Sequence, residues 1–66
     1  GEAKAREIAL AKVPGATASN VVKLELDRDF NEAKYEIKIY SGNTEYEFEI
    51  DAYSGVILEW ASETHR

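Results

Sequence analysis

Apolar side chains occupy every second position in three separate stretches of this chain. The stretches are Val22 to Leu26, Tyr35 to Ile39 and Tyr46 to Ile50, and mostly charged residues lie between the apolar positions. Because strand side chains point alternately to two faces, this spacing predicts strands with one apolar and one polar face. We expect them at about residues 21–28, 34–41 and 44–51, and a shorter apolar run predicts a fourth at about 56–61.

The connections between these strands are short. Residues 28–34, 41–44 and 52–55 allow only hairpin-length links, whereas a parallel crossover needs about a dozen residues or more. The expected sheet is therefore an antiparallel meander. Core positions are odd-numbered in the second strand and even-numbered in the third, so paired residue numbers must sum to an odd value such as 83 or 85. Either register places Lys38 opposite Glu45 or Glu47.

Residues 2–13 have a different period and predict a helix. Good helix formers dominate the segment. Its apolar residues are spaced so that they form one stripe, namely Ala5, Ile8, Ala9 and Val13. Pro14 and Gly15 then end the helix. The predicted fold is α+β, with one N-terminal helix packed on a four-stranded antiparallel meander sheet, in a single domain over residues 1–66.

The segment Asp51–Gly55 predicts a specific turn between the third and fourth strands. An Asp at the start accepts backbone hydrogen bonds across the turn, and a Gly four residues later supplies the positive φ of a type I turn with a bulge. This geometry pairs Asp51 with Val56 and Ile50 with Ile57, so Ile57 faces the helix. A structural role for Asp51 and Gly55 is favoured over a role in recognition.

Leu58 and Trp60 are the candidate partner-binding residues, together with Tyr40. They are expected on the face opposite the helix, beside Glu47 and Glu49, unless a second bulge intervenes. Trp and Tyr are frequent in protein-binding hot spots. The alternative is that Trp60 folds over the sheet edge into the core, or covers a neighbouring domain.

Three other aromatic residues are expected to have structural roles. Tyr35 and Tyr46 should face the core with their hydroxyls at its rim. Phe30 lies in the first hairpin loop, where polar residues would be expected. It either plugs the end of the core or makes an exposed contact, and we favour the plug.

The charge balance argues against several classes of partner. Thirteen acidic residues oppose eight basic ones, for a net charge of −5, which is unfavourable for nucleic acid and for anionic membranes. The acidic row Glu45, Glu47, Glu49 and Asp51 is interpreted as a solvated face. Residues two apart on a strand are about 7 Å apart, too far to converge on one calcium ion.

No catalytic, metal or cofactor motif is present in the sequence. There is no cysteine, no H-E-x-x-H, no glycine-rich phosphate loop and no G-x-S-x-G around either Ser54 or Ser62. The lone His65 has no second ligand partner in the sequence. We expect a protein that is not an enzyme and that binds no metal or cofactor.

The chain resembles a PepSY domain, the module named for peptidase propeptides. The resemblance runs from about Ala3 to Trp60 and is carried by the helix AKAREIALAKVPG and by TEYEFEIDAYSG followed by VILEW. It implies a bacterial, non-catalytic, extracellular or cell-envelope interaction module that inhibits or regulates secreted peptidases. The alternative is a structural spacer or interdomain packing module of a larger envelope protein. The expected partner is a protein, either a peptidase or a neighbouring domain, and the chain is expected to be a monomer or weak dimer.

Overall fold

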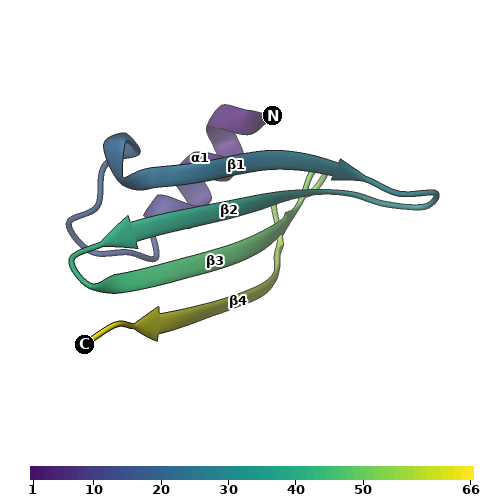
Figure 1. Ribbon diagram of the computed structural model, residues 1–66. Coiled ribbons are helices and arrows are strands. Elements are labelled where there is room, and N and C mark those ends of the chain that lie inside the picture. The colour runs from purple at the N-terminus through teal and green to yellow at the C-terminus, as the bar shows by residue number, and fades with distance from the viewer.

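A helix lies across one face of a four-stranded antiparallel sheet (Figure 1). The computed structural model describes residues 1–66. The sheet order is β1-β2-β3-β4, with the strands β1 (Val21–Arg28), β2 (Ala33–Ser41), β3 (Thr44–Asp51) and β4 (Ile57–Thr64). Helix α1 (Glu2–Leu10) packs on β1 and β2, and a short 3-10 helix, η1 (Ala18–Asn20), precedes β1. The predicted α+β class and meander are confirmed.

Helix α1 ends at Leu10, three residues before the predicted end at Val13. The N–H groups of Lys12 and Val13 bond to the carbonyls of Ala9 and Leu10, each at 3.0 Å. These are i to i−3 bonds, so the last turn tightens into 3-10 geometry. The cause is Pro14, which disfavours the α conformation for the residue before it. Val13 is still buried in the core.

The core lies between α1 and the middle of the sheet. Ala5 and Ala9 are buried, and their small side chains allow the helix axis to approach the strands. The largest fully buried side chains come from β2 and β3, namely Ile37, Ile39, Phe48 and Ile50. Tyr35 is buried and Tyr46 packs at the border of this cluster, which confirms that both face the core.

The register between β2 and β3 follows the alternation of the sequence. Ile37 pairs with Phe48, and Ile39 pairs with Tyr46. The paired numbers sum to 85, one of the two registers predicted. Lys38 therefore lies directly opposite Glu47, one of the two partners that the alternation allows.

The turn between β3 and β4 has the predicted geometry. Asp51 donates its N–H to the carbonyl of Val56 at 2.8 Å, and the Gly55 N–H donates to the Asp51 carbonyl at 3.0 Å. Gly55 has φ of 78°. Ile50 pairs with Ile57, and Ile57 packs against the core.

A second bulge occurs at Leu58. Ile50 pairs with Ile57, but the next residue of β3, Glu49, pairs with Glu59, so Leu58 is an extra residue. The bulge reverses the faces of all the residues that follow it. Trp60 consequently pairs with Phe48 and lies on the helix side of the sheet, not on the opposite face. Strand β4 also continues to Thr64, beyond the predicted end at 61.

Phe30 does not plug the core, which corrects the prediction. Its side chain is 97% exposed. It lies in the β1–β2 hairpin loop, and this hairpin extends well beyond α1 (Figure 1). Because no helix lies over that end of the sheet, the core has no opening there for Phe30 to fill.

Candidate interaction surfaces

Trp60 covers Phe48 at the β4 side of the sheet. The two rings are stacked, with centroids 5.6 Å apart and planes inclined by 7°. Phe48 is 2% exposed, whereas Trp60 is 49% exposed. Helix α1 packs on β1 and β2, so the outer side of the indole has no helix over it. Trp60 thus completes the core with one side and presents the other to solvent.

Two further apolar side chains at the start of β4 are exposed. Val56 directly precedes the strand, and Leu58, the bulge residue, is 50% exposed. Val56, Leu58 and Trp60 follow one another closely along this edge strand and are called the β4 apolar edge. Exposed apolar side chains are a common feature of protein-binding surfaces, so this edge is an apolar candidate on the molecule.

Tyr40 lies away from this edge. It alternates with the buried Ile39, and so it lies on the face opposite α1, which is called the open face below. There it pairs with Glu45 and stacks on the His65 ring, with centroids 6.0 Å apart. The sequence predicted Tyr40 and Trp60 on one face if no second bulge intervened. Because β4 has a bulge at Leu58, the structure places them on opposite faces.

The sequence contains one signal for the Leu58 bulge. Val56, Ile57 and Leu58 are three consecutive apolar residues, and this run breaks the alternation of apolar and polar positions. Such a run does not reveal which residue leaves the ladder. The face of Trp60 could therefore not be assigned from the sequence.

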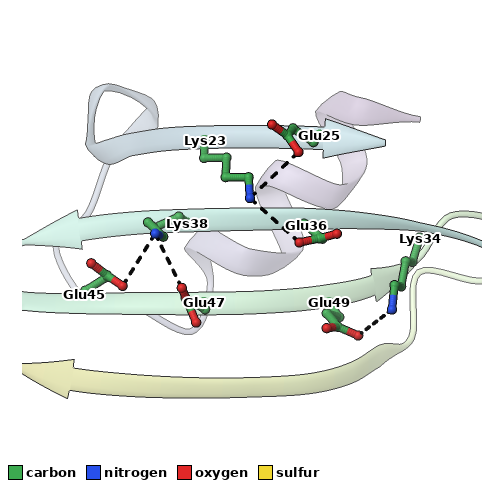
Figure 2. A network of polar contacts seen from close by, with 8 residues as sticks. All are labelled: Lys23, Glu25, Lys34, Glu36, Lys38, Glu45, Glu47 and Glu49. Carbon is green, nitrogen blue, oxygen red and sulfur yellow. Dashed lines mark hydrogen bonds and ion pairs between the residues drawn. The ribbon is translucent and has the colours of Figure 1, made fainter. Parts of the chain in front are cut away.

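Charged side chains cover the open face (Figure 2). Lys38 lies between two glutamates of β3, 3.7 Å from Glu45 and 3.5 Å from Glu47. Lys34 donates to Glu49 at 3.0 Å. The acidic row of β3 is therefore a solvated face with lysines beside it. This arrangement agrees with the interpretation made from the sequence.

One row of this face contains a glutamate from every strand. Cross-strand pairing joins Glu25 to Glu36, Glu36 to Glu49, and Glu49 to Glu59. Like charges directly opposite one another destabilise a sheet. Lysines on the neighbouring rows offset the repulsion, since Lys23 lies 3.8 Å from both Glu25 and Glu36. The hydrogen bond that Lys34 donates to Glu49 raises the pKa of Lys34 above its ordinary value, against the lowering effect of partial burial.

This compensation weakens toward β4. Glu59, at the end of the glutamate row, forms no ion pair, and Glu63 has only the imidazole of His65, at 3.8 Å. No lysine or arginine lies within β4. The β4 side of the open face is thus its most negative part.

Hollows in the surface are small. One of about 120 Å³ lies on the open face beside Lys38, Glu47 and Glu59. Another of about 220 Å³ lies between α1 and the β3–β4 turn, beside Ile8 and Tyr53. Both are smaller than the ~300 Å³ at which ordinary small-molecule sites begin. No group of three potential metal-ligating side chains converges in the chain. The candidates for function are therefore surfaces.

Neither helix is long and apolar enough to cross a membrane.

A family model matches the chain over residues 1–61, and its description is the peptidase propeptide and YPEB domain, PepSY. No curated protein and no solved structure matches the chain significantly. The matched segment begins before α1 and ends within β4, so it includes the helix, the turn at Asp51–Gly55 and Trp60.

Proposed function

This chain belongs to the PepSY family, and we propose that it is a non-catalytic interaction module that regulates a secreted peptidase. Its place of action in this proposal is the cell envelope or the extracellular space. The family match supports a peptidase-associated role in general. The finer statement, that the module binds and inhibits or regulates a peptidase, rests on the surfaces described above.

The single observation that carries the proposal is the exposure of Trp60. A Trp that only filled the core would have no reason to be half exposed beside two further exposed apolar residues, Val56 and Leu58. Trp is enriched among the residues that contribute most to protein–protein affinity. The stack on Phe48 holds the indole in place before binding, which lowers the entropy lost when a partner is bound.

The charge of the open face restricts the kind of partner. Its β4 side is negative and weakly compensated, through Glu59 and Glu63. Nucleic acid and anionic lipid are repelled by such a surface. A protein with basic residues beside an apolar contact is the better complement.

A binding and inhibition assay tests the proposal. The purified domain is titrated against a panel of secreted peptidases, including thermolysin-like enzymes, with both proteolysis and direct binding measured. We expect binding to at least one peptidase, weakened about tenfold or more by Trp60→Ala, as for an interface hot spot. Tyr40→Ala on the open face is the matched control and should leave binding unchanged. The absence of binding and inhibition across the panel would contradict the proposal.

The same apolar edge also supports a second function, the packing of this module against a neighbouring domain. In that case Val56, Leu58 and Trp60 would be buried inside a larger protein. The test is acrylamide quenching of the fluorescence of Trp60, the single Trp of the chain, in the isolated domain and in its parent protein. Protection in the parent protein without any added partner favours packing, and equal quenching favours the free interaction surface.

A further inference from the structure

Strand β4 has one edge without a neighbour. It is the last strand of the sheet, paired only with β3. The direction of its backbone groups follows from one hydrogen bond, because the His65 N–H donates to the Asn43 carbonyl at 2.7 Å. Hydrogen-bonded pairs recur at every second residue of an antiparallel ladder. Glu63, Ala61 and Glu59 therefore direct their backbone groups to β3.

The intervening residues of β4 direct their N–H and C=O groups to the free edge. These residues are Trp60, Ser62 and Thr64. Two side-chain contacts agree with this assignment, since side chains lie closer in the pairs that are not hydrogen-bonded. The Thr44 and Thr64 hydroxyls are 3.0 Å apart, and Trp60 stacks on Phe48. Beyond the bulge, β4 thus presents to solvent a regular row of backbone groups that have no strand partner.

The two faces beside this edge differ in chemistry. On the helix side the edge carries the half-exposed indole of Trp60. On the open face it carries Glu59 and Glu63, which no lysine or arginine compensates. A strand added here would place alternate side chains against these two surfaces. Its best complement has an apolar residue at one position and a basic residue at the next.

We propose that β4 accepts a fifth strand, an extended segment of a partner protein in which apolar and basic residues alternate. The apolar side chains of the segment pack on Trp60 on the helix side. The basic side chains lie beside Glu59 and Glu63. Main-chain hydrogen bonds to Trp60, Ser62 and Thr64 supply affinity, and the alternating side chains supply specificity. This inference rests on the proposed function, because it names how the partner of that module would bind.

A second copy of the chain is a poorer occupant of the same edge. Symmetric antiparallel pairing of two β4 strands would join their open faces. In the register that pairs Ala61 with its own copy, Glu59 of each chain lies directly opposite Glu63 of the other, and like-charged pairs in that position are unfavourable. In the other registers two acidic edges still come together with no lysine or arginine in either β4, and charged residues on an edge are a common protection against self-association. The glutamates therefore favour a basic segment over the copy.

Strand β1 offers a weaker edge. Its helix side is partly covered by α1, although Leu26 is half exposed there. On its open face Lys23 lies close to both Glu25 and Glu36, so a basic segment would meet a lysine. Only on β4 does a half-exposed apolar residue lie beside uncompensated glutamates.

The test uses a capped peptide of about eight residues, the length of a long edge strand, in which valine and lysine alternate. Binding to the full chain is followed by Trp60 fluorescence and by the amide spectra of the isotope-labelled domain. We expect saturable binding, a blue shift of the Trp60 emission, and slowed exchange at the amides of Trp60, Ser62 and Thr64. A peptide with the valines and lysines in two blocks is the matched control for composition.

Two changes isolate the backbone contribution. The alternating peptide methylated at every second backbone nitrogen cannot donate along one edge. Ser62→Pro removes an outward N–H from β4 without removing a bond to β3. The methylated peptide loses several hydrogen bonds and should bind about tenfold more weakly or worse, whereas Ser62→Pro removes one bond and should weaken binding about fivefold. If the two-block peptide or the methylated peptide binds as tightly as the alternating peptide, charge alone attracts the peptide, and strand addition is overturned.

A charge reversal tests the specificity. Glu59→Lys with Glu63→Lys should transfer the preference from the valine–lysine peptide to a valine–glutamate peptide of equal length. An unchanged preference would overturn the proposal, and so would a dimer of the unmodified chain that Ser62→Pro dissociates.

Peptidase binding that is lost in Trp60→Ala but kept in Ser62→Pro would refute strand addition alone. Peptide binding without any peptidase binding would refute the proposed function alone.

Discussion

The indole of Trp60 lies parallel to the ring of Phe48, with their planes inclined by only 7°. The two residues come from neighbouring strands and are paired because Leu58 is bulged out of β4. Phe48 is among the most buried residues of the chain and Trp60 is half exposed. The stability of the core and the character of its surface therefore depend on the same side chain.

Replacing Trp60 should destabilise the domain moderately. A fully buried Trp changed to Ala costs about 3–5 kcal/mol, and Trp60 is only half buried. We expect Trp60→Ala to lower the free energy of unfolding by about 1–3 kcal/mol, of which roughly 1 kcal/mol is the stacking term. Urea denaturation followed by circular dichroism measures this change. Trp60→Phe keeps a ring on Phe48 and should lose less, and equal losses in both variants would contradict a role for the stack.

Gly55→Ala should cost more than Gly42→Ala. Both glycines have positive φ, at 78° and 62°, which costs a residue with a side chain about 1–2 kcal/mol. A Cβ on Gly55 would also lie 3.1 Å from the Ile8 Cδ1 atom, whereas a Cβ on Gly42 would meet nothing within 4 Å. The difference between the two unfolding free energies isolates the contact with Ile8. If Gly42→Ala is the more destabilising change, this account of the turn is wrong.

The stabilising contribution of Asp51 should be lost in acid. Its carboxylate accepts the N–H groups of Ser54 at 2.7 Å and Tyr53 at 3.1 Å. The bond from the Ser54 backbone is the main cause that lowers the pKa of Asp51 below its ordinary value of 3.8. A group with a lowered folded pKa contributes stability above its unfolded pKa and loses it as the pH falls through the folded value.

The matching measurement is thermal unfolding between neutral pH and about pH 2, a range that extends below the usual carboxylate pKa values. Asp51→Asn has no charge to titrate, so its stability should fall less over the acidic range than that of the unmodified chain. Glu45→Gln, on the same strand, serves as the control for loss of one surface carboxylate. Parallel profiles for Asp51→Asn and the unmodified chain would rule out this role.

Lys34 should stabilise the sheet in a salt-dependent manner. Its bond to Glu49 raises the pKa of Lys34, so the contribution is complete below its ordinary pKa and is lost as the pH rises through the folded value. Lys34→Gln should lower the melting temperature at low ionic strength, because the row of glutamates loses a compensating charge. Added salt should reduce this difference, since it screens exposed charges. Lys12→Gln, remote from the row, is expected to show no such salt dependence.

Phe30→Ser should leave the stability unchanged. The Phe30 ring is 97% exposed, and surface substitutions of this kind usually change the free energy of unfolding by less than about 0.5 kcal/mol. Chemical denaturation of the variant checks this expectation. A loss typical of a core aromatic residue would restore the interpretation of Phe30 as a plug.

The sheet could be predicted from the sequence because its physical cause is local. Tyr35 to Ile39 and Tyr46 to Ile50 alternate in opposite parity, and only odd sums of paired numbers keep both apolar sets inside. The turn could also be predicted, since the Asp51 carboxylate accepts backbone N–H groups and Gly55 adopts a positive φ. These features involve neighbouring residues and one periodicity.

The placement of Trp60 and Phe30 depends on the assembled fold. Three consecutive apolar residues, Val56 to Leu58, are compatible with either face of a strand, and the face of Trp60 is set by the bulge that pairs it with Phe48. Whether the Phe30 side chain is buried or exposed depends on how far α1 extends along the sheet. Neither placement can be derived from neighbouring residues alone, and both predictions that involved them needed revision.

The bulge at Leu58 also means that the surfaces of β4 do not depend on the presence of this residue. Glu49 already pairs with Glu59 and Phe48 with Trp60, so deleting Leu58 would remove the bulge and leave both pairs in place. Trp60 would stay on the helix side, and Glu59 and Glu63 on the open face. Related chains that lack this one residue would therefore present the same edge to their surroundings.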